Sequence, residues 1–455
     1  MLFKSMPNNY ESWGRFPLSG VQEVQSCAWT DEARDMILRM AAGRRRFLPR
    51  GLGRSYGDSC LVATGSQLWL TTAWDRVIGF DREGGVFTAE AGISFEQILE
   101  VVLPAGWFLP VTPGTKYITL AGAIANDIHG KNHHAAGNFG NHVIGFDLLR
   151  SDGRVIHCAE NDAPASESGQ LFRATIGGLG LTGVILSATF RLKKVAGPYI
   201  NQEIIKFRGI EDFIRITSES EAGFEYTVSW VDCLSSGKDL RGLFIRGNHS
   251  SQTVAAGEKA LAKPKLRIPF DFPSLTLNPL SVRAFNTLYY HKQVSSKKSG
   301  VTHYDPFFYP LDSVLEWNRI YGKRGFLQYQ FVVPYEADAG RAVNEIMDRI
   351  ARSGQGSFLA VLKIFGNIPG RGLLSFPRPG VTLALDFKNT GSGLLKLLDE
   401  LDALVMTAGG AIYPAKDARM SSNTFFGSFP EAKEFTQFID PCFHSRFSTR
   451  IGLTS

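Results

Sequence analysis

The first segment that could carry chemistry is glycine-rich: residues 50–58 read RGLGRSYGD and end a β-like run at 46–50. Glycine has no side chain to obstruct a ligand, so consecutive backbone N–H groups in such a turn can surround an anionic group such as a diphosphate. Taken alone, a segment of this kind is more often an ordinary turn than a cofactor site. It therefore needs support from elsewhere in the chain.

That support comes from residues 113–130, where clusters of glycine and polar residues occur at 113–115, 119–122 and 126–130. We expect these clusters at the start of a short helix, whose N-terminus would present the positive end of its dipole to a phosphate. The two segments together predict a site for the two phosphates of a dinucleotide.

Two other glycine motifs predict no cofactor. Residues 178–183 match GxGxxG, but a β-like run at 184–192 follows them, whereas the Rossmann fingerprint opens a helix. We interpret them as a tight structural turn. Gly130-Lys131 resembles a P-loop superficially, but Ala125 stands at the first glycine position and no Ser or Thr follows the lysine. We therefore predict no ATP site.

Two basic clusters are also interpreted structurally. His129, His133 and His134 have no acidic residue or cysteine at ligand spacing, so we predict polar packing in a loop and no metal site. The three arginines at 44–46 follow a predicted helix, where they compensate its dipole. We predict no nucleic-acid binding from them.

Polar side chains also interrupt apolar strands in the second half of the chain. Gln328 and Gln330 share one face of a predicted strand, and the other face is apolar. Lys363 lies in an otherwise apolar strand, where its ammonium requires a partner or a wet cavity, unless it lies at an edge position that reaches solvent. Lys416 ends a strand beside a turn, where a lysine is usually a surface residue.

The elements that must position these residues are short in the first half, residues 21–196. The patterns predict a strand at 24–29, a helix capped by Thr30 and ending at Ala42, a strand at 86–91, a helix with a capping box of Ser94 and Gln97, and a hairpin of 146–150 with 155–158. This half is predicted to be α+β.

The second half repeats a β-α-β pattern. It predicts strand 326–333, helix 336–353 and strand 357–365, then strand 381–387, helix 392–407 and strand 411–413, with Gly354 and Gly409 at the helix C-caps. The repetition predicts an antiparallel sheet with helices on one face. Four prolines between 263 and 286 are poor material for a helix or strand, so we predict a mobile loop or lid there.

The composition of the chain limits the number of domains and the class of protein that can be expected. The chain has 455 residues, 44% of them hydrophobic and 20% charged, which is enough for a large core divided between two lobes. The net charge of +6 favours anionic partners, and five cysteines without metal-ligand spacing indicate a reducing compartment. Residues 1–15 lack the apolar core of a signal peptide, and no stretch is apolar enough to cross a bilayer, so we expect a soluble or peripheral protein.

Five motifs give the chain a family resemblance: RGLGRSYGD, DIHGKNHH, GNHV, GFLQYQF and AKDAR. Over residues 13–453 the sequence resembles the decaprenylphosphoryl-β-D-ribose 2′-oxidases, the flavoprotein half of an epimerase. The resemblance implies a two-lobed α+β fold of the vanillyl-alcohol-oxidase, PCMH type. Its parts would be an FAD-binding domain at 1–195, a substrate-binding domain with an antiparallel sheet backed by helices at 196–409, and a C-terminal segment at 410–455 that returns to the FAD domain.

The same resemblance implies the site residues. Those that would bind FAD are Gly51, Leu52, Gly53, Arg54, Ser55, Tyr56, Gly57, Gly114, Thr119, Leu120, Ala121, Gly122, Asn126, Asp127, Ile128, His129, Ile185, Tyr413 and Lys416. Those that would bind substrate are Tyr309, Gln328, Gln330, Lys363, Thr382 and Lys416. No metal is implied. Many relatives tether the flavin through a histidine in the first glycine-rich loop, but Arg54 stands at that place, so we expect non-covalent FAD.

The implied reaction takes a hydride from C2′ of a polyprenyl-phosphate-linked ribose to flavin N5. A separate NADH-dependent short-chain reductase would complete the epimerisation of the resulting 2′-keto sugar to the arabinose donor used in the cell wall. Lys416, His129 and Tyr56 are the implied catalytic residues, and the base that takes the hydroxyl proton would be Lys416 or His129. A cation at Lys416 would also stabilise the reduced flavin.

The implied lipid substrate bears on location. The basic surface and the proline-rich loop would suit a lipid headgroup and a polyprenyl tail, so we expect a cytoplasmic protein with room for peripheral contact at the inner face of the plasma membrane. Two alternatives to this function stay open. One is an alditol or aldonolactone oxidase that uses a free sugar and oxygen, and the other is a non-catalytic binder of lipid phosphate or nucleic acid.

The sequence departs from the family pattern at two positions. Thr382 and Ala384 stand where the best-known members carry asparagine and cysteine. The departure puts the size and polarity of the site in doubt. Inhibitors that trap that cysteine should therefore form no adduct with this protein.

Overall fold

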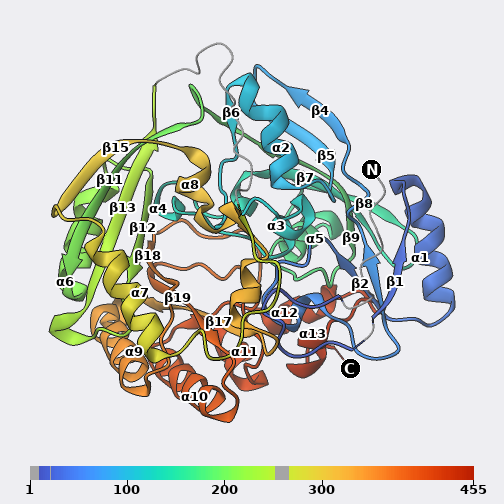
Figure 1. The fold of residues 1–455 in the computed structure, drawn as a ribbon. Helices are drawn as coiled ribbons and strands as arrows, with labels where there is room; N and C mark the ends of the chain where they lie inside the picture. The colour runs from blue at the N-terminus through green and yellow to red at the C-terminus, as the bar shows by residue number, and fades with distance from the viewer. Residues whose placement is uncertain (1–9, 21, 252–265, 455) are drawn as a thin grey trace.

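The computed structural model describes residues 10–20, 22–251 and 266–454. They form two lobes that face each other, the first on the right and the second on the left of Figure 1. Both lobes contain helices and strands, so the predicted α+β class is confirmed. Within the described residues, no helix is both long and apolar enough to cross a bilayer.

The first lobe contains two main sheets. A parallel sheet has the order β1-β3-β2 (Glu23–Ser26, Gln67–Leu70 and Phe47–Arg50) and packs against α1 (Ala33–Ala42). An antiparallel sheet has the order β4-β5-β9-β7-β8 (Val77–Asp81, Val86–Glu90, Val184–Arg191, Val143–Leu149 and Val155–Ala159). Its core is shared with α2 (Phe95–Val102), α3 (Leu120–Ala125) and α5 (Glu167–Thr175). The predicted hairpin is the β7–β8 pair.

One cap in this lobe differs from the prediction. Thr30 lies inside a 3-10 turn, Thr30–Glu32, and its hydroxyl donates to Glu90 (3.2 Å) instead of capping a helix. The Glu32 carboxylate takes over the capping role, since it accepts from the N–H groups of Ala28 (3.1 Å) and Trp29 (3.3 Å). The capping box of Ser94 and Gln97 at the start of α2 is confirmed.

The second lobe is built on one eight-stranded antiparallel sheet. Its order is β15-β11-β13-β12-β18-β19-β17-β20 (Lys297–His303, Tyr199–Arg208, Arg241–His249, Tyr226–Val231, Ala360–Phe365, Gly380–Lys388, Phe326–Pro334 and Ala411–Ile412). The helices α6 (Gly209–Glu221), α9 (Ala339–Ser353) and α10 (Ser392–Thr407) cover one face and share its apolar core (Figure 1). Both predicted β-α-β repeats are present, and Gly354 is the C-cap of α9 as predicted. The C-cap of α10 is Ala408, and Gly409 is the left-handed residue that follows it (φ 64°).

The stretch predicted as a loop contains a helix. Residues 263–265 lie outside the described residues, but α7 runs from Pro279 to His291. Proline is tolerated at the first helical position because the N–H it lacks would have no partner there. The Asn278 side chain caps the helix by accepting from the N–H groups of Leu280 (2.9 Å) and Ser281 (3.0 Å). The prediction of a structureless segment is therefore wrong for 279–286.

Helix α7 lies on the sheet face opposite to α6, α9 and α10. On β12, Val231 packs in the core shared with those three helices, whereas its neighbour Trp230 packs with Leu243 and with Tyr290 of α7. Successive residues of a strand point to opposite faces. Gln328 and Gln330 of β17 alternate in the same way with core residues, so α7 shares its face of the sheet with them.

Both ends of the described chain return to the glycine-rich loop. The N–H groups of Trp13 and Gly14 donate to carbonyls of residues 55 and 56 (2.9 and 3.1 Å), and Gly14 in turn accepts from Phe326 of β17 (2.8 Å). Near the other end, residues 442–444 exchange backbone hydrogen bonds with Phe47 of β2. The loop is therefore fastened to both lobes.

Candidate active site

A cavity of about 340 Å³ lies between the glycine-rich loop of the first lobe and the face of the large sheet that carries Gln328 and Gln330. Most residues that the resemblance singled out line it. These are Gly51, Leu52, Gly53, Arg54, Ser55, Tyr56, Gly114, Thr119, Ala121, Gly122, Asn126, Ile128, His129, Ile185, Gln328, Gln330, Lys363, Tyr413 and Lys416. The two lobes thus bring residues from distant parts of the sequence to one place.

The glycine-rich loop lines the cavity with backbone donors that the protein itself does not use. Within the described part of the chain, the N–H groups of residues 51–55 donate to no protein acceptor. The backbone of Gly53 is left-handed (φ 64°), and a Cβ there would lie 2.2 Å from the Arg50 guanidinium, so only glycine fits. Arg50 supports the loop from behind by donating to the carbonyls of Cys60 (2.6 Å) and Glu11 (2.7 Å). This is an arrangement that can bind a diphosphate through backbone N–H groups.

Arg54 adds a positive charge to that loop. Its guanidinium carbon lies 3.9 Å from the centroid of the Trp13 ring, and among the described residues its buried Nε has no hydrogen-bond partner. Burial lowers the pKa of Arg54, and the nearby Asp312 opposes that shift. An arginine stays protonated in either case. A buried guanidinium with an unused donor fits an anionic group in the cavity.

The helix N-terminus that was predicted to bind a phosphate does not have free N–H groups. Helix α3 does begin after the N-cap Thr119, but the N–H groups of Leu120 and Ala121 donate to the carbonyls of Ile93 (2.9 Å) and Ala91 (2.7 Å). The N–H of Gly122 donates to the Thr119 hydroxyl (3.1 Å). These amides are therefore not free for a phosphate, and the expected helix-terminus contribution is not supported.

Five of the predicted residues do not line the cavity: Gly57, Leu120, Asp127, Tyr309 and Thr382. Each is part of the wall behind it. A Cβ at Gly57 would lie 1.6 Å from the Asp417 carbonyl oxygen, so that glycine permits close packing of two backbones. Asp127 accepts from the Asn138 side chain, the Gly140 N–H and the Ser375 hydroxyl (2.8, 2.9 and 2.5 Å).

The remaining wall residues are held by similar contacts. The Tyr309 hydroxyl pairs with that of Thr112 (2.6 Å), and the Thr382 hydroxyl donates to the Phe331 carbonyl (2.7 Å). The GxGxxG stretch is a turn followed by β9, as predicted, but residues 179, 180 and 183 of it also border the cavity. That contact was not expected from the sequence.

Lys363 and His129 meet on the sheet side of the cavity. Lys363 lies on β18 between β12 and β19, so it is not at a sheet edge, and the edge alternative is wrong. Its Nζ lies 3.0 Å from His129 Nδ1 and 3.2 Å from the Gly130 carbonyl oxygen. Burial and two neighbouring cations, Lys131 and Lys416, lower the pKa of Lys363 to about 7. Burial and Lys363 likewise hold the pKa of His129 well below its usual value, so the imidazole is neutral.

The neutral imidazole restricts its other partner. A protonated Lys363 donates to Nδ1, which places the imidazole proton on Nε2. Nε2 lies 3.0 Å from the side-chain amide of Gln330. With that tautomer the amide must present its oxygen. A neutral Lys363 can either donate to Nδ1 or accept from it, so loss of its proton also permits the opposite tautomer, in which the Gln330 amide donates to Nε2.

A second polar group surrounds Lys416. Its Nζ lies 4.0 Å from the centroid of the Tyr56 ring, and within the described residues it forms no ion pair. The fully buried Asp386 accepts from the Gln328 side chain (2.5 Å). Burial raises the pKa of Asp386 to about 7, while burial lowers the pKa of Lys416 to about 8 and Asp386 opposes that shift. The sequence analysis missed Asp386, although a lone acidic residue in the apolar strand 381–387 was a usable signal.

The cavity as a whole is positively charged. Asp312 is the single carboxylate among the described lining residues, whereas five arginines and lysines line the cavity, namely Arg50, Arg54, Lys131, Lys363 and Lys416. Burial lowers the pKa of Lys131 to about 8. Uncompensated cations are costly away from water, so the arrangement favours ligands that bring negative charge. The unpaired N–H groups, the Arg54 donor and this charge all fit a flavin dinucleotide.

Comparison with known proteins gives independent information. Residues 24–159 match the model of the FAD binding domain family. The decaprenylphosphoryl-beta-D-ribose oxidase of Mycolicibacterium smegmatis is 37% identical, with 99% of each chain covered. An uncharacterised protein of Streptomyces coelicolor is 32% identical over 79% of this chain and all of its own length. A putative D-arabinono-1,4-lactone oxidase of Neurospora crassa is 29% identical, but over only 34% of this chain and 27% of its own.

Proposed function

Because this chain belongs to the decaprenylphosphoryl-β-D-ribose oxidase family of FAD-dependent oxidoreductases, we propose that it oxidises the C2′ hydroxyl of a polyprenyl-phosphoryl-β-D-ribose to the 2′-keto sugar. The observation that carries this proposal is the cavity, in which a backbone cradle for a diphosphate faces a cluster of half-buried cations. Full-length similarity to an oxidase of that substrate supports the choice of sugar. The lactone oxidase is similar over a third of the chain only, which does not favour a free-sugar substrate.

The first lobe would hold the cofactor without a covalent bond. The N–H groups of residues 51–55 and the Arg54 guanidinium would bind the diphosphate. A guanidinium stays protonated and so has no free electron pair to form a bond to the flavin ring. When bound, FAD supplies the hydride acceptor for the reaction.

The residues of this chain would manage the proton. A general base works best with a pKa near the ambient pH, and Lys416, with a pKa of about 8, meets that condition. His129 is less suitable, because its pKa is far lower and both of its ring nitrogens are engaged by Lys363 and Gln330. Neutral Lys416 would take the hydroxyl proton, and the resulting ammonium would compensate the negative charge that the hydride brings into the cavity.

The substrate side would be formed by the polar residues of the large sheet. Gln328 and Gln330 would bind sugar hydroxyls, and Lys363 with Lys131 would face the phosphate. Tyr309 and Thr382 would act from behind the wall by holding Thr112 and the β17 backbone in place. The 2′-keto product would pass to a separate NADH-dependent reductase. The boundaries at residues 195 and 409 remain predictions.

Anaerobic flavin bleaching would test this function. The flavin released from denatured protein is identified first, and then farnesylphosphoryl-β-D-ribose, free ribitol and an aldonolactone are each mixed with the intact holoprotein. We expect FAD, and bleaching by the lipid-linked ribose alone. Bleaching by the free polyol or lactone would support the aldonolactone-type oxidase instead, and protein that cannot be reconstituted with FAD would support a non-catalytic binder.

A further inference from the structure

An unusual share of the exposed apolar surface lies in one segment, residues 266–301, which we call the 266–301 surface. Eight of the eighteen exposed large apolar residues of the described chain belong to the segment: Leu266, Phe270, Leu275, Leu280, Phe285, Leu288, Val294 and Val301. Val301 lies on the face of the large sheet opposite to α7, so the other seven form the apolar part of this surface. Several protrude almost completely, with Val294 94% and Leu275 84% exposed. A concentration of this kind on a water-soluble protein marks an interaction site.

Helix α7 is the centre of this surface and is apolar on two sides. Val282 and Tyr290 are buried against the sheet, as expected for a helix that packs on one face. On the outer side, Leu280, Ala284 and Leu288 follow one another at four-residue spacing, and both leucines are more than 70% exposed. A helix that is apolar all round is normally covered on all sides. Its outer face therefore needs a partner.

The charges around this face are almost all positive. Arg283, Lys292 and Lys298 form no ion pair with any described residue. The one acidic residue of the described part of the segment, Asp271, is neutralised by Arg15 (2.5 Å). Exposed apolar side chains flanked by basic ones are the pattern of proteins that rest on an anionic lipid surface, where the apolar groups enter the acyl region and the cations meet the headgroups.

The surface is also continuous with the cavity. Leu277, just before α7, packs in one apolar cluster with Trp317, Leu311 and Tyr56, which line the cavity. The short strand β14 (Leu266–Arg267) pairs with β16 (Val314–Leu315) in the same region. In Figure 1, α7 crosses the front of the second lobe beside the space between the lobes. A molecule held at the 266–301 surface would therefore lie beside the cavity.

We propose that the 266–301 surface docks the protein on an anionic phospholipid bilayer. The exposed apolar side chains protrude, and none of them lines the cavity or the smaller pocket beside Pro279 and Val282. Protruding side chains suit a fluid acyl layer better than the shaped surface of a second protein. The proposal deepens the proposed function and rests on it in one respect: a lipid-linked sugar would pass from the bilayer along Leu277 into the cavity. Docking itself requires no substrate.

Vesicle sedimentation of the holoprotein tests the proposal without substrate. Vesicles of phosphatidylcholine alone are compared with an equimolar mixture of phosphatidylcholine and phosphatidylglycerol. We expect binding to the anionic vesicles, weakened by salt. The changes Leu280→Ser and Leu288→Ser should each lower partitioning about tenfold. Arg283→Gln and Lys298→Gln should each lower it about fivefold, and only on anionic vesicles.

A double variant in the other lobe tests whether the effect is specific to the 266–301 surface. Val77→Ser with Ile78→Ser removes two exposed apolar side chains from β4 in the other lobe and should leave binding unchanged. Equal binding by all these variants, or none by the unchanged protein, would overturn the proposal. So would sedimentation equilibrium showing a dimer that Leu280→Ser dissociates, since the surface would then be a contact between two copies. Flavin bleaching by a detergent-solubilised substrate tests the oxidase separately, because it needs no bilayer.

Discussion

For single residues in and beside the cavity, burial shifts the pKa and therefore influences the charge as much as the chemical type does. Asp386 illustrates this, since its carboxyl is fully buried, accepts from Gln328 and has a pKa raised to about 7. Its negative charge favours the protonated form of Lys416, which burial alone would disfavour more strongly. We infer that Asp386 is a positioning residue, which sets the pH at which Lys416 can accept a proton.

Replacing that carboxyl by an amide should therefore change the pH profile. With Asp386→Asn, Lys416 loses the charge that raises its pKa, so the neutral lysine appears at lower pH. In the unchanged protein the rate of anaerobic flavin reduction should rise with pH and level off above about 8, near the pKa of Lys416. In the variant the rise should lie at lower pH. Asp147→Asn, a change at a half-exposed carboxylate in the first lobe, is the control and should leave the profile in place. A rise at unchanged or higher pH would contradict this role.

The side chain at position 384 determines whether the protein can react with a thiol-trapping inhibitor. Ala384 lines the cavity and offers no thiol. Cys60 also lines it, but burial raises the pKa of Cys60, and the thiol points toward the carbonyls of residues 55 and 57. Intact-mass measurement after incubation with an inhibitor that traps the active-site thiol of relatives should show no adduct. Ala384→Cys should gain one adduct per chain. An active-site adduct on the unchanged protein would contradict the prediction.

At the scale of elements, the sequence predicted most of what periodicity and glycine control. The two β-α-β repeats could be predicted from the alternation of apolar residues and from helical spacing. The loop at 50–58 could be predicted from its glycines, because glycine can adopt a left-handed backbone that other residues rarely adopt. Helix α7 was missed because prolines were counted as breakers without regard to position, and Pro279 occupies the one helical position that tolerates it. The electrostatic interaction of Asp386 with Lys416 depends on two strands and a turn meeting in space. One-dimensional spacing does not contain that information.

The glycine-rich loop gives a prediction at this scale. Gly53→Ala places a Cβ in left-handed backbone, which costs about 1–2 kcal/mol, and drives it into the Arg50 guanidinium. We expect the purified variant to retain at least about tenfold less FAD, because that strain displaces the cradle. Flavin absorbance per protein measures the loss. Gly223→Ala is the control, since a Cβ there meets nothing within 4 Å. Full flavin content in the Gly53 variant would contradict the role of the loop.

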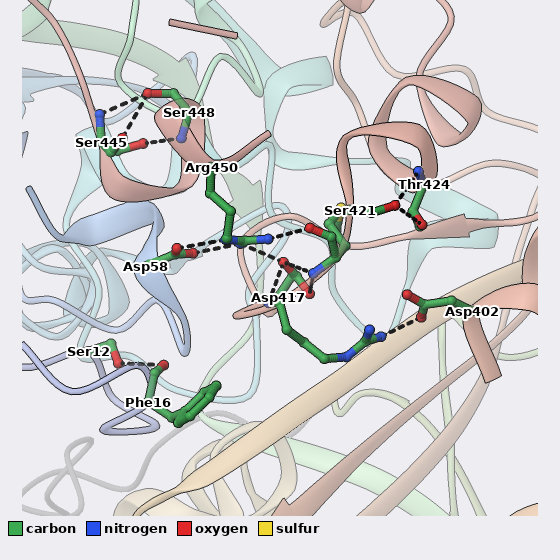
Figure 2. Close-up of polar contacts among 12 residues, drawn as sticks. Ser12, Phe16, Asp58, Asp402, Asp417, Ser421, Thr424, Ser445, Ser448 and Arg450 are labelled. Carbon is green, nitrogen blue, oxygen red and sulfur yellow. Dashed lines mark hydrogen bonds and ion pairs between the residues drawn. The ribbon is translucent and has the colours of Figure 1, made fainter. Parts of the chain in front are cut away.

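At the scale of the molecule, the C-terminal segment completes the first lobe. Figure 2 shows Arg450 between Asp58, the last residue of the glycine-rich loop, and Asp417, which follows Lys416. Its guanidinium donates to both oxygens of Asp58 (2.9 and 2.8 Å) and to Asp417 (2.8 Å). Both carboxylates are 97% buried, and their proximity raises the pKa of Arg450. One side chain thus fixes the glycine-rich loop and the turn that carries Lys416 to each other.

Removing that side chain should affect stability and cofactor together. Arg450→Met leaves two buried carboxylates without their cation, which should lower the free energy of unfolding by about 3–5 kcal/mol. Urea unfolding measures this, and flavin absorbance should fall in parallel. Arg446→Met on the same helix, α13 (Arg446–Arg450), removes only an exposed hydrogen bond to the Leu18 carbonyl and should cost less than about 1 kcal/mol. Equal effects of the two changes would contradict the proposed role of Arg450.

The contact between Arg450 and Asp58 also bears on how the protein is made. The two residues are 392 positions apart, so Asp58 leaves the ribosome well before its partner is synthesised. At about 5–20 residues per second, the delay is about 20–80 s. During that interval the nascent first lobe lacks the contacts with the C-terminal segment that complete it. Flavin should therefore be acquired only after translation has nearly finished, and a ribosome stalled in the second lobe should carry an uncoloured chain.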